Sequence, residues 1–382
     1  MTVYGQNIHT STIYIIITYI HGGKKMKYDI IHFEALGKEA DHLREETEKA
    51  QAEGKLPKEY NYVITPLNLQ QYMAENPDTV LPDIITTKTH SKLPEEYLNN
   101  GVKKSIITRS AGYDHFEHLA EVANVTSLRE YCVNAVAQTG IKFAYAAAGY
   151  LNHYTNNTLT FERNKTYSFM EFNKDRIATV FGVGKIGKRV YELLEGNGLT
   201  VQAVDIRQDE LNTLYGGTVN FVTKEEAIAN SDIIINAMNL TRLPESKFYN
   251  VNYFSEEDLA KAKDGLVFVN VTRGEIAPES TLLKFYKEGK IIGIGLDVFS
   301  DENGFSAAVN GKKDFETDNH KAGKELLDMA INRTGNVYVQ PHQAFNSDVA
   351  AMSKASETIK HMIAWHANNK VRFDEQLPYY VG

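Results

Sequence analysis

Three side chains able to move protons or bind carboxylates follow apolar runs in the second half of the chain. Arg273 follows LVFVNV, Glu302 lies shortly after IIGIGL, and His342 follows VYVQP. An arginine presents a rigid fork of donors that suits a carboxylate or carbonyl oxygen. A histidine gives or takes a proton near neutral pH, and a neighbouring carboxylate would orient its imidazole. Each residue alone is as well explained by a structural ion pair, so only the three together indicate acid–base chemistry.

The segment from Phe181 to Arg207 has the spacing of a dinucleotide-binding unit. Gly182, Gly184 and Gly187 form a G-x-G-x-x-G pattern between a β-branched run at 177–181 and an amphipathic helix. The first glycine would permit a tight turn, the second the approach of a pyrophosphate, and the third close packing of the helix on the strand. The helix N-terminus would offer unpaired N–H groups and a partial positive charge to the phosphates.

Asp205, at the end of the next expected strand, is the residue expected to distinguish NAD from NADP. Its carboxylate could accept hydrogen bonds from both ribose hydroxyls and would repel a 2′-phosphate, which favours NAD over NADP. Arg207 keeps NADP open, because an arginine there could accept that phosphate. The plain alternative is an ordinary strand–turn–helix with structural glycines. Further cofactor contacts are expected at the helix start and at neighbouring strand ends, from Lys185, Ile186, Met238, Asn239, Val271 and Thr272.

Apolar strands alternate with helical patterns along most of the chain, and these elements must position the candidates. A first series of strands is expected at Tyr28–Phe33, Tyr62–Thr65, Asp83–Thr86 and Ser105–Thr108. A second series is expected at Ile177–Phe181, Val201–Val204, Ile233–Ala237, Leu266–Val271, Ile291–Leu296 and Val337–Val339. The alternation predicts parallel sheets, whose ligands bind beyond the carboxyl ends of the strands. All three chemical candidates fall just after such ends.

Helices are expected at Lys38–Ala52, from Asn134 to about Tyr150, and at Val349–Asn368, where the last would return to the first domain. Between them, Thr155–Lys174 is polar with interleaved aromatic residues. We expect either an arm that packs on another surface or a simple surface loop there.

Length, charge and cysteine content limit the classes of protein to which the chain could belong and the partners that are expected. With 382 residues, two domains are expected, and 41 basic against 49 acidic residues, without a long basic run, argue against nucleic acid as the main partner. The single cysteine, Cys132, excludes an intrachain disulfide framework and a multi-cysteine metal site, and it fits a reducing cytoplasm. No close cluster of metal-ligating residues occurs, and no metal is expected.

Residues 1–25 differ from the rest. The apolar run Ile13–Ile20 is shorter than a membrane span needs, and Lys24 and Lys25 follow it, whereas a signal peptide would place its positive charge first. We therefore expect an extension outside the fold, with translation starting at Met26, as a ribosome-binding site read in frame would explain. A weak interfacial anchor is the alternative, and no membrane partner is expected.

The strings GVGKIG…D, NVTRGE, GLDVFSDE and PHQAF occur in order, and together they resemble the D-2-hydroxyacid dehydrogenase family, near its D-lactate and D-2-hydroxyisocaproate branch. The resemblance implies an α/β fold of two doubly wound parallel-sheet domains. A Rossmann cofactor domain at 133–342 would be inserted in a flavodoxin-like substrate domain made of 26–132 and 343–382. It also implies NAD as the cofactor and a homodimer through the cofactor domain, for which Thr155–Lys174 is the candidate arm.

The resemblance assigns roles to particular residues. Arg273 would hold the carboxylate and carbonyl oxygen of a 2-oxo acid, His342 would be the general acid/base, and Glu302 its acidic partner. Asp297 would lie near the nicotinamide carboxamide. The substrate would meet the backbone N–H groups around Ala111 and Gly112 and the side chains of Tyr131 and Phe345.

The expected function is NAD-dependent reduction of a 2-oxo acid to the D-2-hydroxy acid. A regulatory NAD-binding protein without turnover is the alternative from another class, because a fold alone does not fix function. A phosphite-type enzyme could use a similar triad. The identity of the 2-oxo acid stays open, as does the role of the unusually long stretch at 303–341, which could cover the site or lie on the surface.

Overall fold

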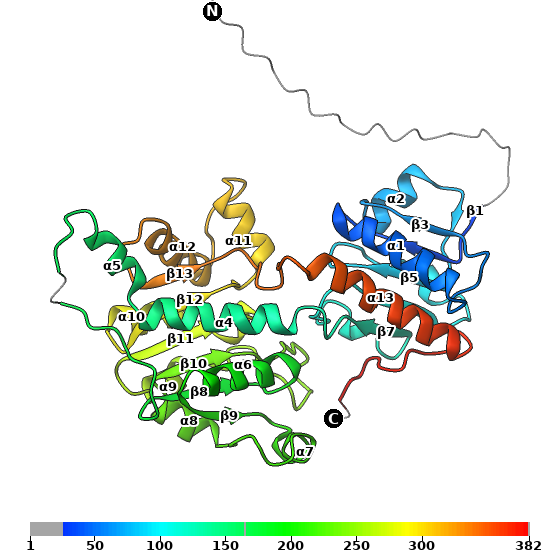
Figure 1. Ribbon diagram of the computed structural model, residues 1–382. Helices are drawn as coiled ribbons and strands as arrows, with labels where there is room; N and C mark the ends of the chain where they lie inside the picture. Colours follow the sequence, from blue (N-terminus) through cyan, green and yellow to red (C-terminus); the bar gives the residue numbers. More distant parts are fainter. Residues whose placement is uncertain (1–25, 164–165, 381–382) are drawn as a thin grey trace, which may run out of the picture.

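The computed structural model describes residues 26–163 and 166–380. They form two parallel β-sheets with helices on both faces, drawn as the right-hand and left-hand halves of Figure 1. The extension 1–25 lies outside the described residues, so its interpretation stays a prediction. In the part of the chain that is described, no helix is long and apolar enough to cross a membrane.

The first sheet has the strand order β3-β2-β5-β6-β7. Its strands are β2 (Ile30–His32), β3 (Tyr62–Ile64), β5 (Ile84–Thr87), β6 (Lys104–Thr108) and β7 (Ala123–Ser127). Numbered along the chain this order is 2-1-3-4-5, the flavodoxin-like order that was predicted. A small pair, β1 (Met26–Lys27) with β4 (Thr79–Val80), lies beside it.

Helices cover both faces of this sheet. They are α1 (Lys38–Ala52), α2 (Leu69–Glu75), α3 (Glu95–Leu98), the 3-10 turn η1 (Glu117–Leu119) and, from the end of the chain, α13 (Ala350–Ala367). The last helix packs beside α1, where Leu43 of α1 and Met362 and Trp365 of α13 are fully or almost fully buried in one apolar cluster. The predicted return of the C-terminal helix to the first domain is therefore correct (Figure 1).

The second sheet has the order β13-β12-β11-β10-β8-β9. Its strands are β8 (Ile177–Phe181), β9 (Thr200–Val204), β10 (Ile233–Asn236), β11 (Leu266–Asn270), β12 (Ile291–Leu296) and β13 (Val337–Val339). A single parallel bridge from Ala203 to Phe221 extends the sheet beyond β9. With that bridge counted third along the chain, the order is that of a Rossmann fold with one strand added.

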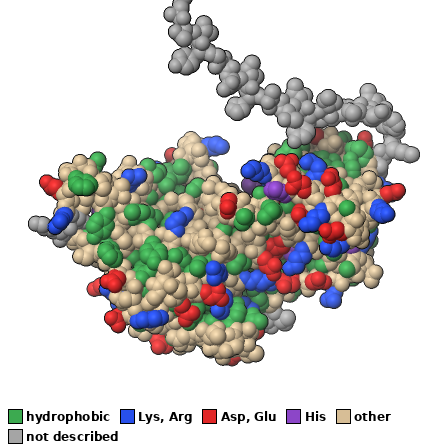
Figure 2. Space-filling view, viewed as in Figure 1, with side chains coloured by type: hydrophobic (Ala, Val, Ile, Leu, Met, Phe, Trp, Pro, Cys, Tyr) green, Lys and Arg blue, Asp and Glu red, His purple; other side chains and the backbone are tan. Residues whose placement is uncertain are grey.

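Helices also cover both faces of the second sheet. They are α4 (Val133–Ala148), α5 (Leu151–Asn157), α6 (Lys185–Gly196), α7 (Gln208–Leu214), α8 (Lys224–Asn230), α9 (Glu256–Ala260), η2 (Gly274–Ile276), α10 (Glu279–Lys287), α11 (Glu302–Val309) and α12 (Asp318–Ile331). The glycines of IIGIGL let α4 lie close on β12, because a Cβ at Gly295 would be 2.5 Å from the Cβ of Phe143. Hydrophobic side chains gather on the outer surface over α4 and α5 (Figure 2).

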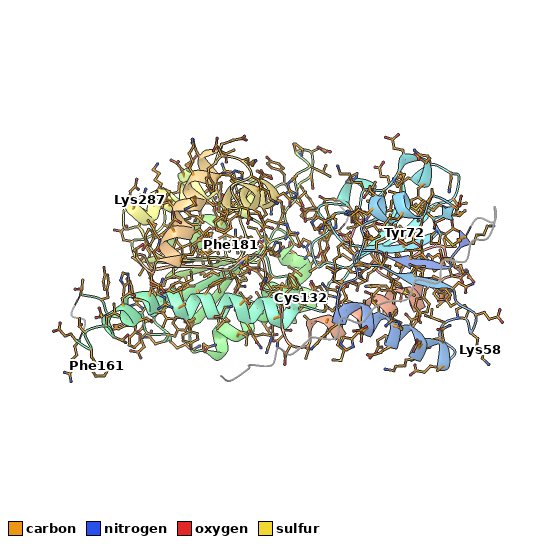
Figure 3. All side chains as sticks on the ribbon, turned by 90° about the horizontal axis from the view of Figure 1, so that it is seen from above. Lys58, Tyr72, Cys132, Phe161, Phe181 and Lys287 are labelled. Carbon is orange, nitrogen blue, oxygen red and sulfur yellow. The ribbon has the colours of Figure 1, made fainter. Side chains whose placement is uncertain are left out.

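The chain passes between the halves twice. It leaves β7 and enters α4 at Cys132, which lies between the two halves in Figure 3, and it returns through 342–349 to α13. Each half has an apolar cluster on either face of its sheet, so the predicted class of two doubly wound α/β units is confirmed. The domain boundaries at 132/133 and 342/343 stay a prediction.

Residues 303–341 form most of α11, all of α12, and β13. Phe305 of α11 stacks on Phe299 with ring centres 4.4 Å apart, and Leu326 of α12 is fully buried in the apolar cluster of the second sheet. None of these residues lines the large cavity between the halves. The stretch therefore does not cover the cavity, and it packs on and extends the second sheet instead.

Candidate active site between the two sheets

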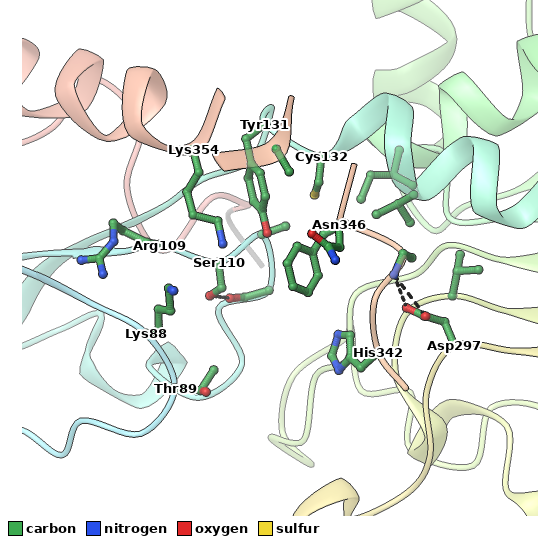
Figure 4. Close-up of a pocket in the computed structure, with 18 of the residues that line it drawn as sticks. Lys88, Thr89, Arg109, Ser110, Tyr131, Cys132, Asp297, His342, Asn346 and Lys354 are labelled. Carbon is green, nitrogen blue, oxygen red and sulfur yellow. Dashed lines mark hydrogen bonds between the residues drawn. The ribbon is translucent and has the colours of Figure 1, made fainter. Parts of the chain in front are cut away.

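A cavity of about 710 Å³ lies between the halves, at the carboxyl ends of strands from both sheets. Figure 4 shows part of its wall, with Lys88, Ser110 and Lys354 on one side and His342 and Asp297 on the other. Eleven of the residues predicted from the sequence line it: Ala111, Gly112, Tyr131, Ile186, Asn239, Val271, Thr272, Arg273, Asp297, His342 and Phe345. The tertiary fold thus brings together residues that lie up to 234 positions apart, from Ala111 to Phe345.

His342 and Glu302 form a hydrogen-bonded pair at this cavity. The Nδ1 of His342 lies 2.7 Å from Oε2 of Glu302, the first residue of α11. The His342 backbone has φ of +47°, and its N–H donates to the Asp297 carbonyl at 2.7 Å. A left-handed conformation at a non-glycine residue is costly and must be held by its surroundings. With Nδ1 engaged by the carboxylate, Nε2 is the nitrogen left for proton exchange with a ligand.

Asp297 anchors the loop that carries His342. It is almost fully buried, and its carboxylate accepts hydrogen bonds from Gln340 Nε2 at 2.6 Å, from the Gln343 N–H at 2.9 Å and from the Ala344 N–H at 3.1 Å. Burial raises the pKa of Asp297, and these hydrogen bonds oppose the rise. The proximity of Asp297 to a nicotinamide stays a prediction, whereas its contacts make it a positioning residue for the loop.

Arg273 reaches across the cavity to the loop after β6. Its Nη2 lies 2.8 Å from Oδ1 of Asp114, and Arg242 Nη1 lies 2.7 Å from the other oxygen of that carboxylate. Gly112 permits this approach, since a Cβ there would be 2.2 Å from Nη2 of Arg273. Gly112 therefore lies beside the guanidinium, and carboxylate binding by the backbone N–H groups around Ala111 and Gly112 stays a prediction.

The glycine fingerprint forms a second recess of about 200 Å³, lined among others by Gly182, Gly184, Asp205, Met238 and Asn239. Gly182 has φ of +82° and approaches Met238 so closely that a Cβ would lie 2.8 Å from the Met238 Cα. By contrast, a Cβ at Gly184 would meet nothing within 4 Å.

Gly184 is the residue that precedes the 12-residue helix α6. The open space beside it, in front of the helix N-terminus, fits a pyrophosphate held by backbone N–H groups. The residues of this recess therefore fit a dinucleotide.

Asp205 is held in place for contact with a ribose. Its carboxylate accepts the N–H groups of Val183 and Arg207, each at 2.9 Å. The Arg207 guanidinium lies 3.8 Å from the ring centre of Tyr380 and 3.1 Å from a Glu210 oxygen. Since Arg207 is engaged by these neighbours, the geometry favours a free ribose over a 2′-phosphate.

Two of the expected cofactor residues lie apart from both recesses. Gly187 packs against the turn, because a Cβ there would be 1.8 Å from the Gly182 carbonyl oxygen. Lys185 forms an ion pair with Glu130 at 2.8 Å and lines a neighbouring surface depression instead. Gly187 thus has the packing role expected of the third fingerprint glycine, whereas cofactor contact by Lys185 stays a prediction.

Sequence reasoning missed several residues of the site. The C-terminal Tyr379 and Tyr380 line the fingerprint recess, and Asp114 pairs with Arg273. Lys88 and Lys354 line the large cavity. One signal was present for Lys354, since it lies at helical spacing between Ala350 and Thr358, on the face of α13 that is buried.

The family model, the relatives and the solved structure to which this chain is similar are all described as 2-hydroxyacid or D-lactate dehydrogenases. Residues 144–344, just over half of the chain, match the family model "D-isomer specific 2-hydroxyacid dehydrogenase, NAD binding domain". A D-lactate dehydrogenase from Treponema pallidum is 26% identical over 228 residues, which cover 56% of this chain and 64% of that protein. A 2-hydroxyacid dehydrogenase homolog from Haemophilus influenzae is 27% identical over 187 residues, 49% of this chain and 52% of that one. These matches span about half to two thirds of the relatives' lengths.

The fold has solved counterparts. The crystal structure of a D-lactate dehydrogenase from Aquifex aeolicus, complexed with NAD and lactic acid, superimposes with a TM-score of 0.71 at 22% identity. The superposition covers 92% of this chain and all of that one. At this identity the likeness establishes the two-sheet architecture.

Proposed function

Because the chain belongs to the D-isomer specific 2-hydroxyacid dehydrogenase family, we propose that it reduces a 2-oxo acid to the D-2-hydroxy acid with NADH. The observation that carries the proposal is the 2.7 Å contact between His342 and Glu302, at a cavity that Arg273 also lines. An imidazole oriented by a carboxylate and a guanidinium beside it are the groups that reduction of a 2-oxo acid needs.

The substrate carboxylate would bind beside Arg273 and the backbone N–H groups around Ala111 and Gly112. A guanidinium fork binds a carboxylate through two parallel hydrogen bonds and so fixes the plane of the substrate. The Tyr131 and Phe345 rings, with centres 6.4 Å apart, would bound the substrate side chain. Orientation by these groups presents the C2 carbonyl oxygen to His342.

NADH, when bound, supplies the hydride that is transferred to C2. His342 donates the proton from Nε2 to the carbonyl oxygen, while Glu302 holds Nδ1 and so fixes the orientation of the imidazole. Arg273 stabilises the negative charge that develops on that oxygen before the proton arrives. The cofactor would be held at the α6 N-terminus by the turn at Gly184, with its ribose on Asp205.

The test is oxidation of NADH at 340 nm by the purified chain against pyruvate, 2-oxoisocaproate, phenylpyruvate and oxaloacetate, followed by chiral analysis of the product. Turnover that yields the D-enantiomer supports the proposal. The rival function is a regulatory NAD(H)-binding protein. Tight NADH binding without turnover of any acid would support that rival and contradict the proposal.

We further infer a homodimer formed through the cofactor-binding half. The segment around α5 exposes Leu159, Phe161 and Phe169, with exposed fractions of 89%, 92% and 60%, and a second copy would cover this apolar surface. Light scattering after size exclusion should give twice the chain mass for the parent and the single mass for Phe161→Glu. A monomeric parent would contradict the inference. The unpaired, buried Cys132 supports function in the reducing cytoplasm.

A further inference from the structure

The wall of the large cavity opposite His342 is built from charged side chains. Glu39 comes from α1, Lys88 directly follows β5, Arg109 directly follows β6, and Lys354 lies on α13. A pocket for a short or branched aliphatic side chain would be lined by apolar groups here. The charged wall therefore bears on which 2-oxo acid the cavity accepts.

Most of the charge on this wall is compensated within the protein. Arg109 is fully buried, and its Nε donates to one Glu39 oxygen at 2.9 Å, while its other nitrogens donate to Thr86 and Phe33. Lys88 Nζ lies 2.6 Å from the second Glu39 oxygen. Arg109 and Lys88 thus share the single Glu39 carboxylate, and each of these two cations has an ionic partner in the protein.

The third cation of this wall, Lys354, has no such partner in the part of the chain that the structure describes. Only 7% of the residue is exposed, and its Nζ forms no hydrogen bond or ion pair with any described residue. It lies 4.8 Å from the ring centre of Tyr131 and 5.0 Å from that of Phe345. Figure 4 shows Lys354 and Lys88 directed toward the same part of the cavity, next to Ser110.

The two ring contacts do not account for a buried lysine. A cation–π contact contributes less than the desolvation of an unpaired ammonium costs. Burial lowers the pKa of Lys354 to about 8, and Lys88 and Arg109 add to the lowering while Glu39 opposes it. A cation kept at a cavity wall under these conditions has the position of a group that receives an anion from the ligand.

We propose that the substrate is a 2-oxo acid with a second carboxylate at the far end of its side chain, bound by Lys354 with Lys88. The proposal rests on the function proposed above, in which Arg273 binds the first carboxylate. Tyr131 and Phe345 contact Lys354 and line the same cavity as Arg273, so they would cover the methylene groups of the substrate. Lys354 is the cation of this wall without an ionic partner among the described residues, and one side-chain carboxylate would supply that partner.

The test compares kcat/KM for acids of matched chain length, with NADH saturating. 2-Oxoglutarate is paired with 2-oxopentanoate, and oxaloacetate with 2-oxobutyrate. The diacid of at least one pair should be preferred by about 30-fold or more, the value of one well-placed charge pair. Lys354→Met should remove most of that preference through KM, and it should leave or raise the activity on the neutral acid. Lys360→Met, an exposed lysine on the same helix, is the matched control and should behave as the parent.

The measurements distinguish failure of the proposed function from failure of this inference. No turnover of any acid contradicts the proposed function, whereas turnover of the neutral acids without preference for a diacid overturns only this inference. A strong preference for 3-phosphohydroxypyruvate over both diacids would overturn the choice of carboxylate. NADH affinity, followed by fluorescence, reports whether Lys354→Met is folded. If that variant does not bind NADH, Lys88→Met takes its place, and equal losses on the diacid and the neutral acid would then overturn the proposal.

Discussion

The Asp114 carboxylate lies 2.8 Å from Nη2 of Arg273. A loop of the half that contains the first sheet therefore holds a guanidinium of the half that contains the second sheet. Arg242 binds the other oxygen of the same carboxylate. Burial raises the pKa of Asp114, but the two arginines outweigh burial and lower it to about 2 from the ordinary 3.8. The ionised carboxylate is thus stabilised in the folded protein relative to the unfolded chain.

Replacing Asp114 with Asn should therefore destabilise the protein in a pH-dependent way. For an acid whose pKa is lower in the folded state, the contribution is complete above the unfolded pKa and is lost as the pH falls toward the folded one. Asp114→Asn should cost about 2 kcal/mol at pH 7, and the difference from the parent should shrink between pH 4 and pH 2. Urea unfolding across that range measures it. A difference that does not vary with pH would contradict the ion-pair explanation.

The fingerprint glycines separate a binding role from a packing role. Gly184→Ala places a methyl group in open space, so the unfolding free energy should change by less than about 0.5 kcal/mol, while NADH affinity should fall by about tenfold or more. Gly187→Ala drives a Cβ against the Gly182 carbonyl and should destabilise the fold by about 3 kcal/mol. Fluorescence titration with NADH and urea unfolding test both. Full NADH affinity in Gly184→Ala would show that the pyrophosphate binds elsewhere.

Asp205 should set the preference for NADH over NADPH. Asp205→Asn keeps an acceptor for the Val183 N–H but removes the charge that repels a 2′-phosphate, and Arg207 lies next to it. The ratio of kcat/KM for the two cofactors should shift toward NADPH by about tenfold or more. Asp209→Asn, at an exposed position in the first turn of α7, is the surface control. An unchanged ratio in Asp205→Asn would mean that the ribose does not reach this carboxylate.

His342 and Glu302 should differ in the size of their effects. His342→Asn removes the proton donor and should lower kcat by about 10²- to 10⁴-fold with NADH affinity retained. Glu302→Gln keeps a hydrogen-bond acceptor near Nδ1 and should lower kcat by less. Stopped-flow measurement of NADH oxidation separates the chemical step from product release. Near-parental kcat in His342→Asn would exclude this residue as the acid.

Sequence patterns predicted the elements whose side chains are apolar, and missed those whose buried side chains are polar. β8, β12 and β13 have the predicted bounds, because short and mostly apolar runs in a parallel sheet are distinctive. β7, with the sequence ANVTS, was missed, although Asn124 is almost fully buried and donates to Ser105 and to the Val371 carbonyl. Those partners come from distant parts of the chain, and no local pattern encodes them.

The same distinction holds for the site. Arg273 and His342 were found because each follows a recognisable strand, and the sheet places strand ends together. Lys354 was not found, since a lysine in a helix is usually on the solvent side. Its burial depends on the packing of α13 against α1 and on the neighbouring Tyr131 and Phe345. The Asp114–Arg273 pair likewise joins two halves whose contact the sequence does not specify.

The burial of Lys354 should make the protein less stable than its own Lys354→Met variant in the absence of substrate. The charged groups that act on this ammonium are Glu39 of α1, Lys88 after β5, Arg109 after β6 and, when ionised, Cys132 before α4. A lysine whose pKa is about 8 when folded and 10.5 when unfolded destabilises the folded state fully below pH 8. The destabilisation is relieved as the pH rises from 8 to 10.5, because there the unfolded chain binds the extra proton.

Lys354→Met should therefore be more stable than the parent by up to about 3 kcal/mol at pH 7, less the lost cation–π contacts, and the gain should decrease toward pH 10. The measurement is urea unfolding of the parent, Lys354→Met and the surface control Lys360→Met at both pH values. The comparison separates the contribution of Lys354 to the unfolding free energy from that of the other groups that titrate. A variant that is less stable than the parent at both pH values would show that Lys354 is retained for packing. A gain at pH 7 that disappears at pH 10 is the pattern of an ammonium held in the cavity wall for an anion that the protein itself does not supply.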